Sequence, residues 1–381
     1  MAIDNKDKKV LNVPHLRFPE FSGKWKKCTL GDITINFNLR NKEKIELPMY
    51  SVTNNRGFIP QSEQFEDRDM VGEDIKAYKI IHNKDFAYNP ARINVGSIAK
   101  YNGSKPCMIS SLYVCFKAAN GIDEDWLMHL LRSPKIQYYY NINGEGGVRI
   151  YLFYPNFARI RTSFPTIAEQ RKIANLLSLL DARITTQNKI IEDLKKLKSA
   201  IYQNLFFHLQ GDKVPLSELA EIIKGQQING SELSENGKYY VMNGGITPSG
   251  YYDNYNTEAD TISISEGGNS CGYVQYNSSD FWSGGHCYTL RIKPTALIST
   301  PFLFHFLKWK EPDIMALRSG SGLPNIQKKD LSKVCIIVPT LDEQQQLIAL
   351  LSTFQMKIEN EEIFTSNLNK QKQHLLSQMF I

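Results

Sequence analysis

The sequence has no long apolar run, no paired cysteines and no strong charge of one sign. No stretch approaches the ~18 consecutive apolar residues that a membrane helix needs, and the first ten residues are charged where a secretory signal would be apolar. We therefore expect a cytoplasmic protein without membrane contact. The six cysteines stand far apart, with no CxxC pair and no matching histidines. This spacing suggests neither a disulfide framework nor a zinc site and favours reduced, buried thiols.

Catalytic motifs are missing as well. The sequence contains no GxxxxGK[ST] phosphate loop, no HExxH, no GxSxG and no GxGxxG. The run Asn89-Pro90-Ala91-Arg92 is partly similar to the (D/N/S)PP(Y/F) motif of amino-methyltransferases. It lacks the second proline and the aromatic residue that would stack on the target base. We therefore predict no catalytic residue in this chain.

What is present is an ordinary folded composition. Of 381 residues, 42% are hydrophobic and 22% are charged, which excludes a disordered chain. The length predicts two or three domains with sizeable cores. The net charge of +6, from 45 basic and 39 acidic side chains, permits nucleic-acid binding without arguing for it.

An internal repeat dominates the sequence. The run PTIAEQ at residues 165–170 recurs as PTLDEQ at residues 339–344, an offset of 174 that later positions keep. Leu177 returns as Leu351, and Phe206 returns as Phe380. Self-similarity at a fixed offset predicts two copies of one structural unit.

Each copy of this run opens a long amphipathic helix. Thr166 and Thr340 suit the N-cap, and Glu169 and Glu343 stand three residues later, which is the spacing of a capping box. Apolar residues then follow alternating steps of four and three, the period that keeps one helix facing another over many turns. Each helix would span about 60 Å, too long for one globular domain to cover. We predict that the two helices pack together as an antiparallel coiled coil.

The apolar seam has matching positions in both copies. The matched pairs are Ile173 with Leu347, Leu177 with Leu351, Leu180 with Phe354, Ile184 with Ile358 and Leu194 with Leu368; the seam also includes Ile191, which matches Thr365, and Leu375, which matches Ile201. Polar residues interrupt both seams at the same places, Gln187 with Glu361 and Lys198 with Lys372. Two unrelated helices would not share the offset, the caps and the breaks, so the seams indicate a duplication.

The stretches before the two helices resemble each other more loosely. Residues 126–131 match residues 302–307 at an offset of 176. Each stretch carries a short helix and β-like runs, such as residues 112–116 and 288–292, bounded by Gly, Asn and Ser. This pattern indicates α+β domains.

We therefore predict four segments with pseudo-two-fold symmetry. Two globular domains would be joined by two long antiparallel helices. The segments are a first globular domain at residues 1–164, a helix at 165–211, a second globular domain at 212–338 and a helix at 339–381.

Loops supply the candidate contact residues. Glycine-rich segments stand at matching places, GEGGVR at residues 144–149 and SGSGLPN at residues 319–325, and glycine lets the backbone approach a partner closely. Asn, Gln and Arg carry the donors and acceptors that match adenine and guanine edges in the major groove. Any one of these residues could instead serve only a turn. The candidates for DNA contact are Asn54, Asn55, Arg56, Arg92, Asn94, Arg149, Tyr151, Asn243, Ser270, Arg318, Asn325 and Gln327.

The positive charge is unevenly distributed. Residues 1–164 hold 24 basic and 17 acidic side chains, whereas residues 212–338 hold 11 and 13. Phosphate attraction supplies most of the non-specific affinity for DNA. We therefore expect the isolated chain to bind DNA weakly and to depend on basic partner subunits.

Three features point to one family: the duplicated plan, the helix openings PTIAEQR (165–171) and PTLDEQQ (339–345), and the leading RFPEF (17–21) with Trp25. In these features the chain resembles, over nearly its whole length, the specificity (S) subunits of type I restriction-modification systems. The resemblance implies two target recognition domains, each reading one half of a bipartite double-stranded DNA sequence. It also implies helices that set the spacing between the half-sites and dock the other subunits.

The resemblance further implies a heteromeric complex with two methyltransferase (M) subunits and with restriction (R) subunits. Methylation, translocation and cleavage would belong to those partners, which would bind S-adenosylmethionine, ATP and Mg. This chain would then be non-catalytic and hold no cofactor or metal. A competing hypothesis is a coiled-coil scaffold that joins partner proteins without reading DNA sequence, and a third is a standalone methyltransferase or nuclease.

Overall fold

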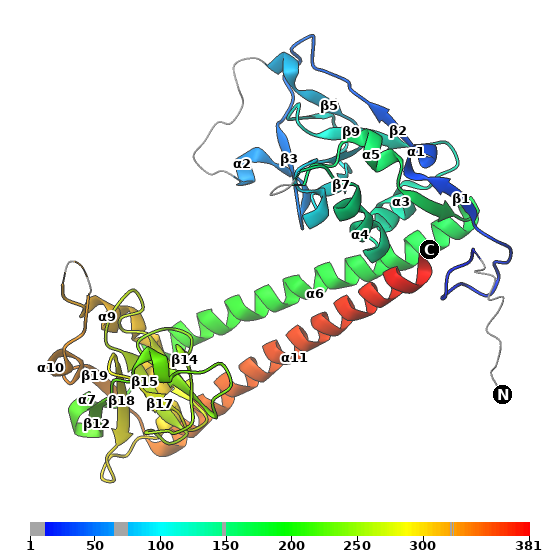
Figure 1. Cartoon of the computed structure of the whole chain (residues 1–381). Coiled ribbons are helices and arrows are strands. Elements are labelled where there is room, and N and C mark those ends of the chain that lie inside the picture. The colour runs from blue at the N-terminus through cyan, green and yellow to red at the C-terminus, as the bar shows by residue number, and fades with distance from the viewer. Residues whose placement is uncertain (1–11, 65–74, 147–149, 321, 323) are drawn as a thin grey trace, which may run out of the picture. The chain divides into compact units, whose positions relative to one another are not determined.

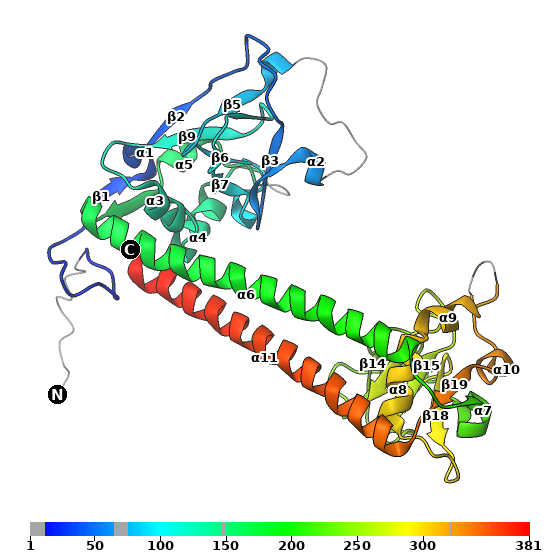
Figure 2. The same cartoon turned by 180° about the vertical axis from the view of Figure 1, so that it is seen from behind.

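The computed structural model describes residues 12–64, 75–146, 150–320, 322 and 324–381. The chain forms two compact units (Figure 1, Figure 2): unit 1 comprises Met1–Asn188 with Ile363–Ile381, and unit 2 comprises Lys189–Glu362. Two long helices, α6 (Ile167–Phe207) and α11 (Leu341–Met379), each contribute to both units. Both helices begin directly after the threonines that the repeat predicts as caps. The units cut across the four predicted segments, because each unit takes part of both helices.

Unit 1 is built on a four-stranded antiparallel sheet with the order β2-β9-β6-β7. Its strands are β2 (Thr34–Phe37), β9 (Val114–Ala118), β6 (Phe86–Tyr88) and β7 (Ile98–Lys100). Three strand pairs accompany this sheet: β1 (Lys26–Thr29) with β10 (Arg161–Phe164), β3 (Tyr50–Thr53) with β4 (Gly57–Pro60), and β5 (Lys79–Ile81) with β8 (Cys107–Ile109). The short helices are α1 (Leu30–Ile33), α2 (Gln61–Gln64), α3 (Glu124–Leu131), α4 (Pro134–Asn143) and α5 (Tyr154–Ala158), with single 3-10 turns at η1 (Ile75–Ala77) and η2 (Ile93–Val95).

Unit 2 is built on a sheet with the order β12-β18-β15-β16, again antiparallel. Its strands are β12 (Ala220–Lys224), β18 (Cys287–Ile292), β15 (Thr261–Ser265) and β16 (Val274–Asn277). The other strands are β11 (Asp212–Pro215) with β19 (Cys335–Val338), and β14 (Gly250–Tyr252), β13 (Tyr239–Met242) and β17 (Trp282–Ser283) in a three-stranded sheet. The short helices are α7 (Leu216–Leu219), α8 (Thr300–Trp309), α9 (Glu311–Ala316) and α10 (Lys328–Leu331), with a 3-10 turn at η3 (Gly230–Glu232).

The two units repeat one plan. The sheet orders correspond strand for strand, and an antiparallel pair, β1-β10 or β11-β19, leads into each long helix. Each core is also completed by an aromatic residue from the far end of a long helix. The ring of Phe380 lies 6.0 Å from that of Trp126 in unit 1, and the ring of Phe206 lies 6.2 Å from that of Phe302 in unit 2. The α+β fold class with two long antiparallel helices is therefore confirmed.

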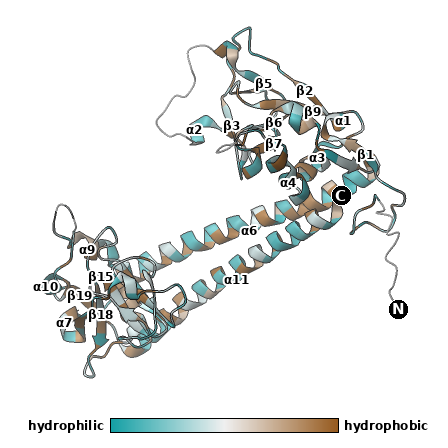
Figure 3. Ribbon diagram, in the orientation of Figure 1, coloured by the Kyte–Doolittle hydropathy of each residue, from teal (hydrophilic) through white to brown (hydrophobic). Residues whose placement is uncertain are grey.

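Within each unit the two long helices run antiparallel and are linked by polar side chains. In unit 1 the Lys372 ammonium lies 2.5 Å from the Asp181 carboxylate. In unit 2 Lys195 pairs with Glu362 at 2.6 Å, and Lys198 donates to the side chain of Gln355 at 2.6 Å. Polar and apolar residues alternate along α6 and α11 (Figure 3), as expected for helices with one covered face.

All six cysteines are free thiols, and four of them are buried: Cys107, Cys115, Cys271 and Cys287. Cys335 is exposed and Cys28 is half-buried, so the expectation of buried thiols holds for four of the six. Over the described part of the chain, no helix combines the length and the apolar character needed to cross a membrane.

Candidate nucleic-acid interface

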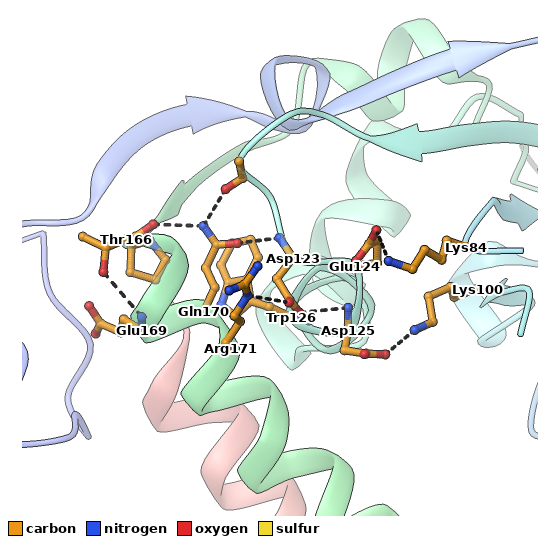
Figure 4. A network of polar contacts seen from close by, with 12 residues as sticks. Lys84, Lys100, Asp123, Glu124, Asp125, Trp126, Thr166, Glu169, Gln170 and Arg171 are labelled. Atoms are coloured by element: carbon orange, nitrogen blue, oxygen red, sulfur yellow. Dashed lines mark hydrogen bonds and ion pairs between the residues drawn. The ribbon is translucent and has the colours of Figure 1, made fainter.

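A buried glutamine ties the start of each long helix to a globular unit, as Figure 4 shows for Gln170 in unit 1. In unit 1 the Gln170 side chain is fully buried, and its Nε2 donates to the carbonyl oxygens of Pro165 at 3.0 Å and Gly121 at 3.3 Å. Its Oε1 accepts from the backbone N–H of Asp123 at 2.8 Å. The amide therefore bridges the helix start and the turn that leads into α3, which fixes the angle between them.

Unit 2 repeats this bridge. The Nε2 of Gln344, also fully buried, donates to Pro339 O at 3.0 Å and Leu297 O at 2.9 Å, and its Oε1 accepts from Ser299 N at 2.9 Å. Every partner stands at the position of the repeat that is equivalent to its counterpart in unit 1. The sequence repeat is thus also a repeat of hydrogen bonds.

The predicted capping boxes differ between the copies. In unit 2 the box is complete, because Thr340 N donates to the Glu343 carboxylate at 3.0 Å while Glu343 N lies 3.4 Å from Thr340 Oγ1. In unit 1 only the bond from Glu169 N to Thr166 Oγ1 is present, at 3.4 Å. The prediction of a complete box at Thr166 is therefore wrong.

The physical reason is a competing partner for Glu169. Both carboxylate oxygens accept from the Arg17 guanidinium, each at 2.7 Å, and the indole N–H of Trp25 lies 3.2 Å from Oε1. Glu169 is only 1% exposed. A bidentate Arg contact is stronger than a cap bond to one backbone N–H, so the carboxylate turns away from the helix start.

The predicted seam faces inward along both long helices. Ile173, Leu177, Ile191, Leu351, Ile358 and Leu368 are buried, and Leu180, Ile184, Leu194, Leu347, Phe354 and Leu375 are half-buried. The polar breaks are part of the same face, with Gln187 buried and Lys198 and Lys372 engaged across the pair. Their docking of partner subunits remains a prediction.

A histidine stands at the same place in each unit, between a short helix and a long one; His129 is buried and His305 is half-buried. The His129 ring, on α3, lies 3.2 Å from Ser178 Oγ on α6, and the His305 ring, on α8, lies 3.4 Å from the Tyr202 hydroxyl on α6. Burial lowers the pKa of each imidazole to about 4. The Asp181 carboxylate opposes this shift at His129 and the positive charges of Lys372 and Arg132 add to it, while Lys198 adds to it at His305. Both histidines are therefore neutral packing residues at physiological pH.

The glycine-rich loops are closed by identical backbone bridges. Glu145 and Tyr151 exchange two N–H···O bonds of 2.8 Å, and Ser319 and Asn325 exchange bonds of 2.9 and 3.0 Å. Both members of each bridge are repeat equivalents of the members of the other, so the two loops occupy equivalent positions. The predicted contact residue Arg149 lies outside the described residues.

In unit 1 the other candidates come from two adjoining segments. Asn54, Asn55 and Arg56 form the exposed turn between β3 and β4, beside a cleft of about 680 Å³ that Lys100 and Arg132 also line. Asn54 O lies 3.0 Å from the position that a Cβ on Gly96 would occupy, which brings this turn against the segment that carries Arg92 and Asn94. Gly96 has a φ of +100°, a conformation that favours glycine.

Some of these side chains already have protein partners. The Arg56 guanidinium pairs with Glu63 at 2.9 Å, and Asn94 Nδ2 donates to the Asn141 side chain at 3.2 Å. Arg92 is exposed. The nearby Asn89 accepts from Ala91 N at 3.0 Å through its side chain, so the methyltransferase-like run is a local turn.

In unit 2 the candidates form one contiguous surface. Ser270 Oγ donates to Gly244 O at 3.0 Å, and Asn243 Oδ1 accepts from His286 N at 3.1 Å. Gly267 forms a backbone bridge with Asn325, whose side chain accepts from Gln327 Nε2 at 3.0 Å. Arg318 is exposed next to the base of the glycine-rich loop.

Sequence reasoning missed the acid at the centre of this surface. The Glu266 side chain accepts from Lys224 Nζ at 2.7 Å and from the Tyr288 hydroxyl at 2.9 Å, and it lies 3.8 Å from His286. Burial, followed by the bond to Glu266, raises the pKa of Tyr288. These contacts fix the loop backbone, because Ile326 N donates to Glu266 O at 2.8 Å. No local pattern marks Glu266, since its partners come from three distant strands and loops.

Comparison with known proteins gives one consistent result. Residues 211–368 match the family model described as type I restriction modification DNA specificity domain. A putative type I specificity subunit of Mycoplasma pneumoniae is 36% identical over 149 residues, which is 39% of this chain and 40% of that protein. The chain thus matches about two fifths of the length of this relative. A putative type I restriction enzyme MjaX specificity subunit of Methanocaldococcus jannaschii is 23% identical over 375 residues, covering 89% of this chain and 87% of that one.

Solved structures agree on the fold. The S subunit of a type I restriction-modification system from M. genitalium superposes with a TM-score of 0.62 at 18% identity, covering 97% of this chain and 99% of that one. The HsdS subunit from Thermoanaerobacter tengcongensis superposes with a TM-score of 0.53 at 18% identity, covering 96% and 98%.

Proposed function

Because the chain belongs to the family of type I restriction-modification specificity subunits, we propose that it selects the DNA target of such a complex. Each unit reads one half of a bipartite double-stranded sequence through its loops. The paired helices α6 and α11 set the distance between the half-sites and dock two methyltransferase subunits, to which restriction subunits add.

One observation carries this proposal: the two units share a hydrogen-bonded framework but differ in the side chains it presents. The Gln170 and Gln344 bridges share three equivalent bonds, to which Gln344 adds one from the Ser299 hydroxyl, and the two loop-closing bridges match bond for bond. The exposed loop residues are not. A duplicated hydrogen-bonded framework with divergent loops suits two DNA-binding units that contact different base sequences in related orientations.

Catalysis is assigned to the partners. The chain serves as a non-catalytic, cytoplasmic subunit, while the methyltransferase and restriction subunits hold S-adenosylmethionine, ATP and Mg. The residues of this chain bind and position the DNA. The docked methyltransferase subunits then methylate the bases that lie within their reach. Residues 212–338, the globular part of unit 2, hold 11 basic and 13 acidic side chains, which fits a DNA-reading domain that relies on partners for phosphate attraction.

The spacer role is tested by lengthening both helices. One heptad is inserted after Asn188 in α6 and one after Glu362 in α11, which keeps the seam in phase. Seven residues add about 10 Å, or about three base pairs at 3.4 Å each. The chain is co-expressed with its methyltransferase subunits, and the methylated sites are mapped by sequencing.

The expected result is a motif with the same bases in both half-sites and a longer gap. A control insertion of equal length after Asn254, in an exposed loop of unit 2, leaves the gap unchanged. An unaltered gap in the helix variant refutes the spacer role. Methylation without any sequence preference in the wild-type complex refutes the specificity function and favours the scaffold hypothesis.

A further inference from the structure

Two exposed side chains follow each glycine-rich loop in register. In unit 1 they are Tyr151 and Phe153, and in unit 2 they are Asn325 and Gln327, which stand at the equivalent positions of the repeat. In both units the first residue of the pair closes the loop through the backbone bridge described above. The duplicated frame therefore presents two side chains at one equivalent place in each unit.

The residue between the two members anchors the pair. Leu152 and Ile326 are both fully buried. Leu152 N donates to Pro90 O at 2.9 Å, and Ile326 N donates to Glu266 O at 2.8 Å. Pro90 and Glu266 are themselves equivalent positions of the repeat, so the anchor is duplicated too. Because side chains alternate along an extended backbone, burying the middle residue turns its two neighbours outward together.

The two pairs differ in chemistry, yet in each the members contact one another. The rings of Tyr151 and Phe153 stack at 6.2 Å with an interplanar angle of 11°, and the residues are 38% and 50% exposed. In unit 2 Gln327 Nε2 donates to Asn325 Oδ1 at 3.0 Å, and both residues are exposed. The pair in unit 1 presents a flat apolar surface of stacked rings, and the pair in unit 2 presents two side-chain amides.

The hydrogen bond between the two amides determines which polar atoms of the pair remain free for another partner. It uses the Nε2 of Gln327 and the Oδ1 of Asn325, so the pair retains an acceptor in Gln327 Oε1 and a donor in Asn325 Nδ2. Among single bases, only adenine offers a donor beside an acceptor at its major-groove edge, N6–H and N7. Guanine offers two acceptors at this edge, which leaves the Gln327 Oε1 without a donor, and cytosine offers one donor, which leaves the Asn325 Nδ2 without an acceptor.

The charge around the amide pair also suits DNA. Arg318 precedes the loop, and Lys328 and Lys329 follow Gln327 directly, and all three are exposed. They form a local positive site on a unit whose charge balance is otherwise slightly negative. Flanking cations of this kind fix the register of a protein on the duplex through phosphates, while the amides face base edges.

We propose that the two residues after each glycine-rich loop are a specificity-determining pair, and that Asn325 and Gln327 select an adenine in the half-site of unit 2. The proposal rests on the proposed function, because it presumes that the units read DNA. The stacked Tyr151 and Phe153 occupy the same position in unit 1 and select a different, apolar feature such as the thymine methyl group.

Site mapping of three variant complexes tests the assignment. The variants are Asn325→Ala with Gln327→Ala, Tyr151→Ala with Phe153→Ala, and Asn254→Ala, an exposed amide in another loop of unit 2, as the matched control. The amide variant should lose the requirement for one A·T pair in one half-site only. The aromatic variant should relax a position in the other half-site, and the control should keep the full motif.

A second measurement identifies the base atom. At the relaxed position adenine is replaced by 7-deazaadenine, which lacks the N7 acceptor, and binding of the assembled complex to the duplex is measured. The wild type should lose about 5- to 150-fold in affinity, and the amide variant should lose nothing further. Retention of every base by the amide variant, or relaxation at a G·C pair, overturns the inference. A wild-type complex without any motif overturns the proposed function instead.

Discussion

Removing the glutamine bridge should weaken each unit by a similar amount. In Gln170→Ala the buried bond to Pro165 O is lost outright, and the partly buried bonds to Gly121 O and Asp123 N are replaced by imperfect solvation. An orphaned buried group costs about 1–3 kcal/mol, and a partly solvated bond costs about 1 kcal/mol or less. The sum is about 3 kcal/mol for unit 1. The equivalent bonds of Gln344 give about the same loss in unit 2.

Urea unfolding measures this loss. Each unit contains two tryptophans, Trp25 and Trp126 in unit 1 and Trp282 and Trp309 in unit 2, so fluorescence reports on both. Amide hydrogen exchange at Asp123 and Ser299 adds a local probe, since each amide should exchange faster only in the variant that removes its own acceptor. Gln345→Ala, an exposed position on α11, is the control. A loss below about 1 kcal/mol in both bridge variants would refute the reasoning.

Two further predictions concern titratable side chains that folding removes from water. Arg17→Met should destabilise unit 1 by about 3–5 kcal/mol, because it strands the buried Glu169 carboxylate. Lys172→Met loses an exposed ion pair with Glu20 and a cation–π contact with Phe18, and it should cost about 1–2 kcal/mol or less. Thermal unfolding compares the two variants, and equal losses would contradict the buried-pair argument. The pKa of His129 and of His305 is about 4 in the folded chain and about 6.5 in the unfolded chain. Between these two pH values the unfolded chain binds more protons than the folded chain. The free energy of unfolding should therefore fall as the pH drops from about 6.5 to 4, and it should level off below about pH 4. The variant carrying His129→Gln and His305→Gln should lose less stability over this window in urea titrations, and an unchanged pH profile would rule out burial of the neutral imidazoles.

The parts of this fold that sequence predicts are those encoded locally. A cap, a seam step or a β-like run needs only neighbouring residues, so the starts of α6 and α11 and the covered face of each helix could be placed from the repeat. The predicted start of one strand was wrong by two residues, because the apolar residue at that start lies in an exposed turn. The run at residues 112–116 is observed as β9, which begins at Val114, because Leu112 sits in a turn with 77% exposure.

Contacts between distant residues were beyond that reasoning. Glu169 leaves its cap because Arg17, 152 residues away, offers two bonds. Gln170 and Gln344 stood in the quoted repeat, yet only the folded backbone shows that their amides bridge a helix start to a turn. Asn325 and Gln327 were each predicted as candidates for DNA contact, but their bond to one another depends on the buried Ile326 between them. The same holds for the stacked Tyr151 and Phe153.

The division of the chain into units has a consequence for its synthesis. Unit 2, Lys189–Glu362, is continuous, whereas unit 1 needs Ile363–Ile381 in addition to Met1–Asn188. Leu376, Met379 and Phe380 are buried in the core that contains Trp126. Domains usually fold in the order in which they leave the ribosome, but here the part translated first can be completed only after the last helix turns emerge. A nascent or prematurely terminated chain therefore leaves its earliest-made unit open, with apolar surface available to chaperones and proteases.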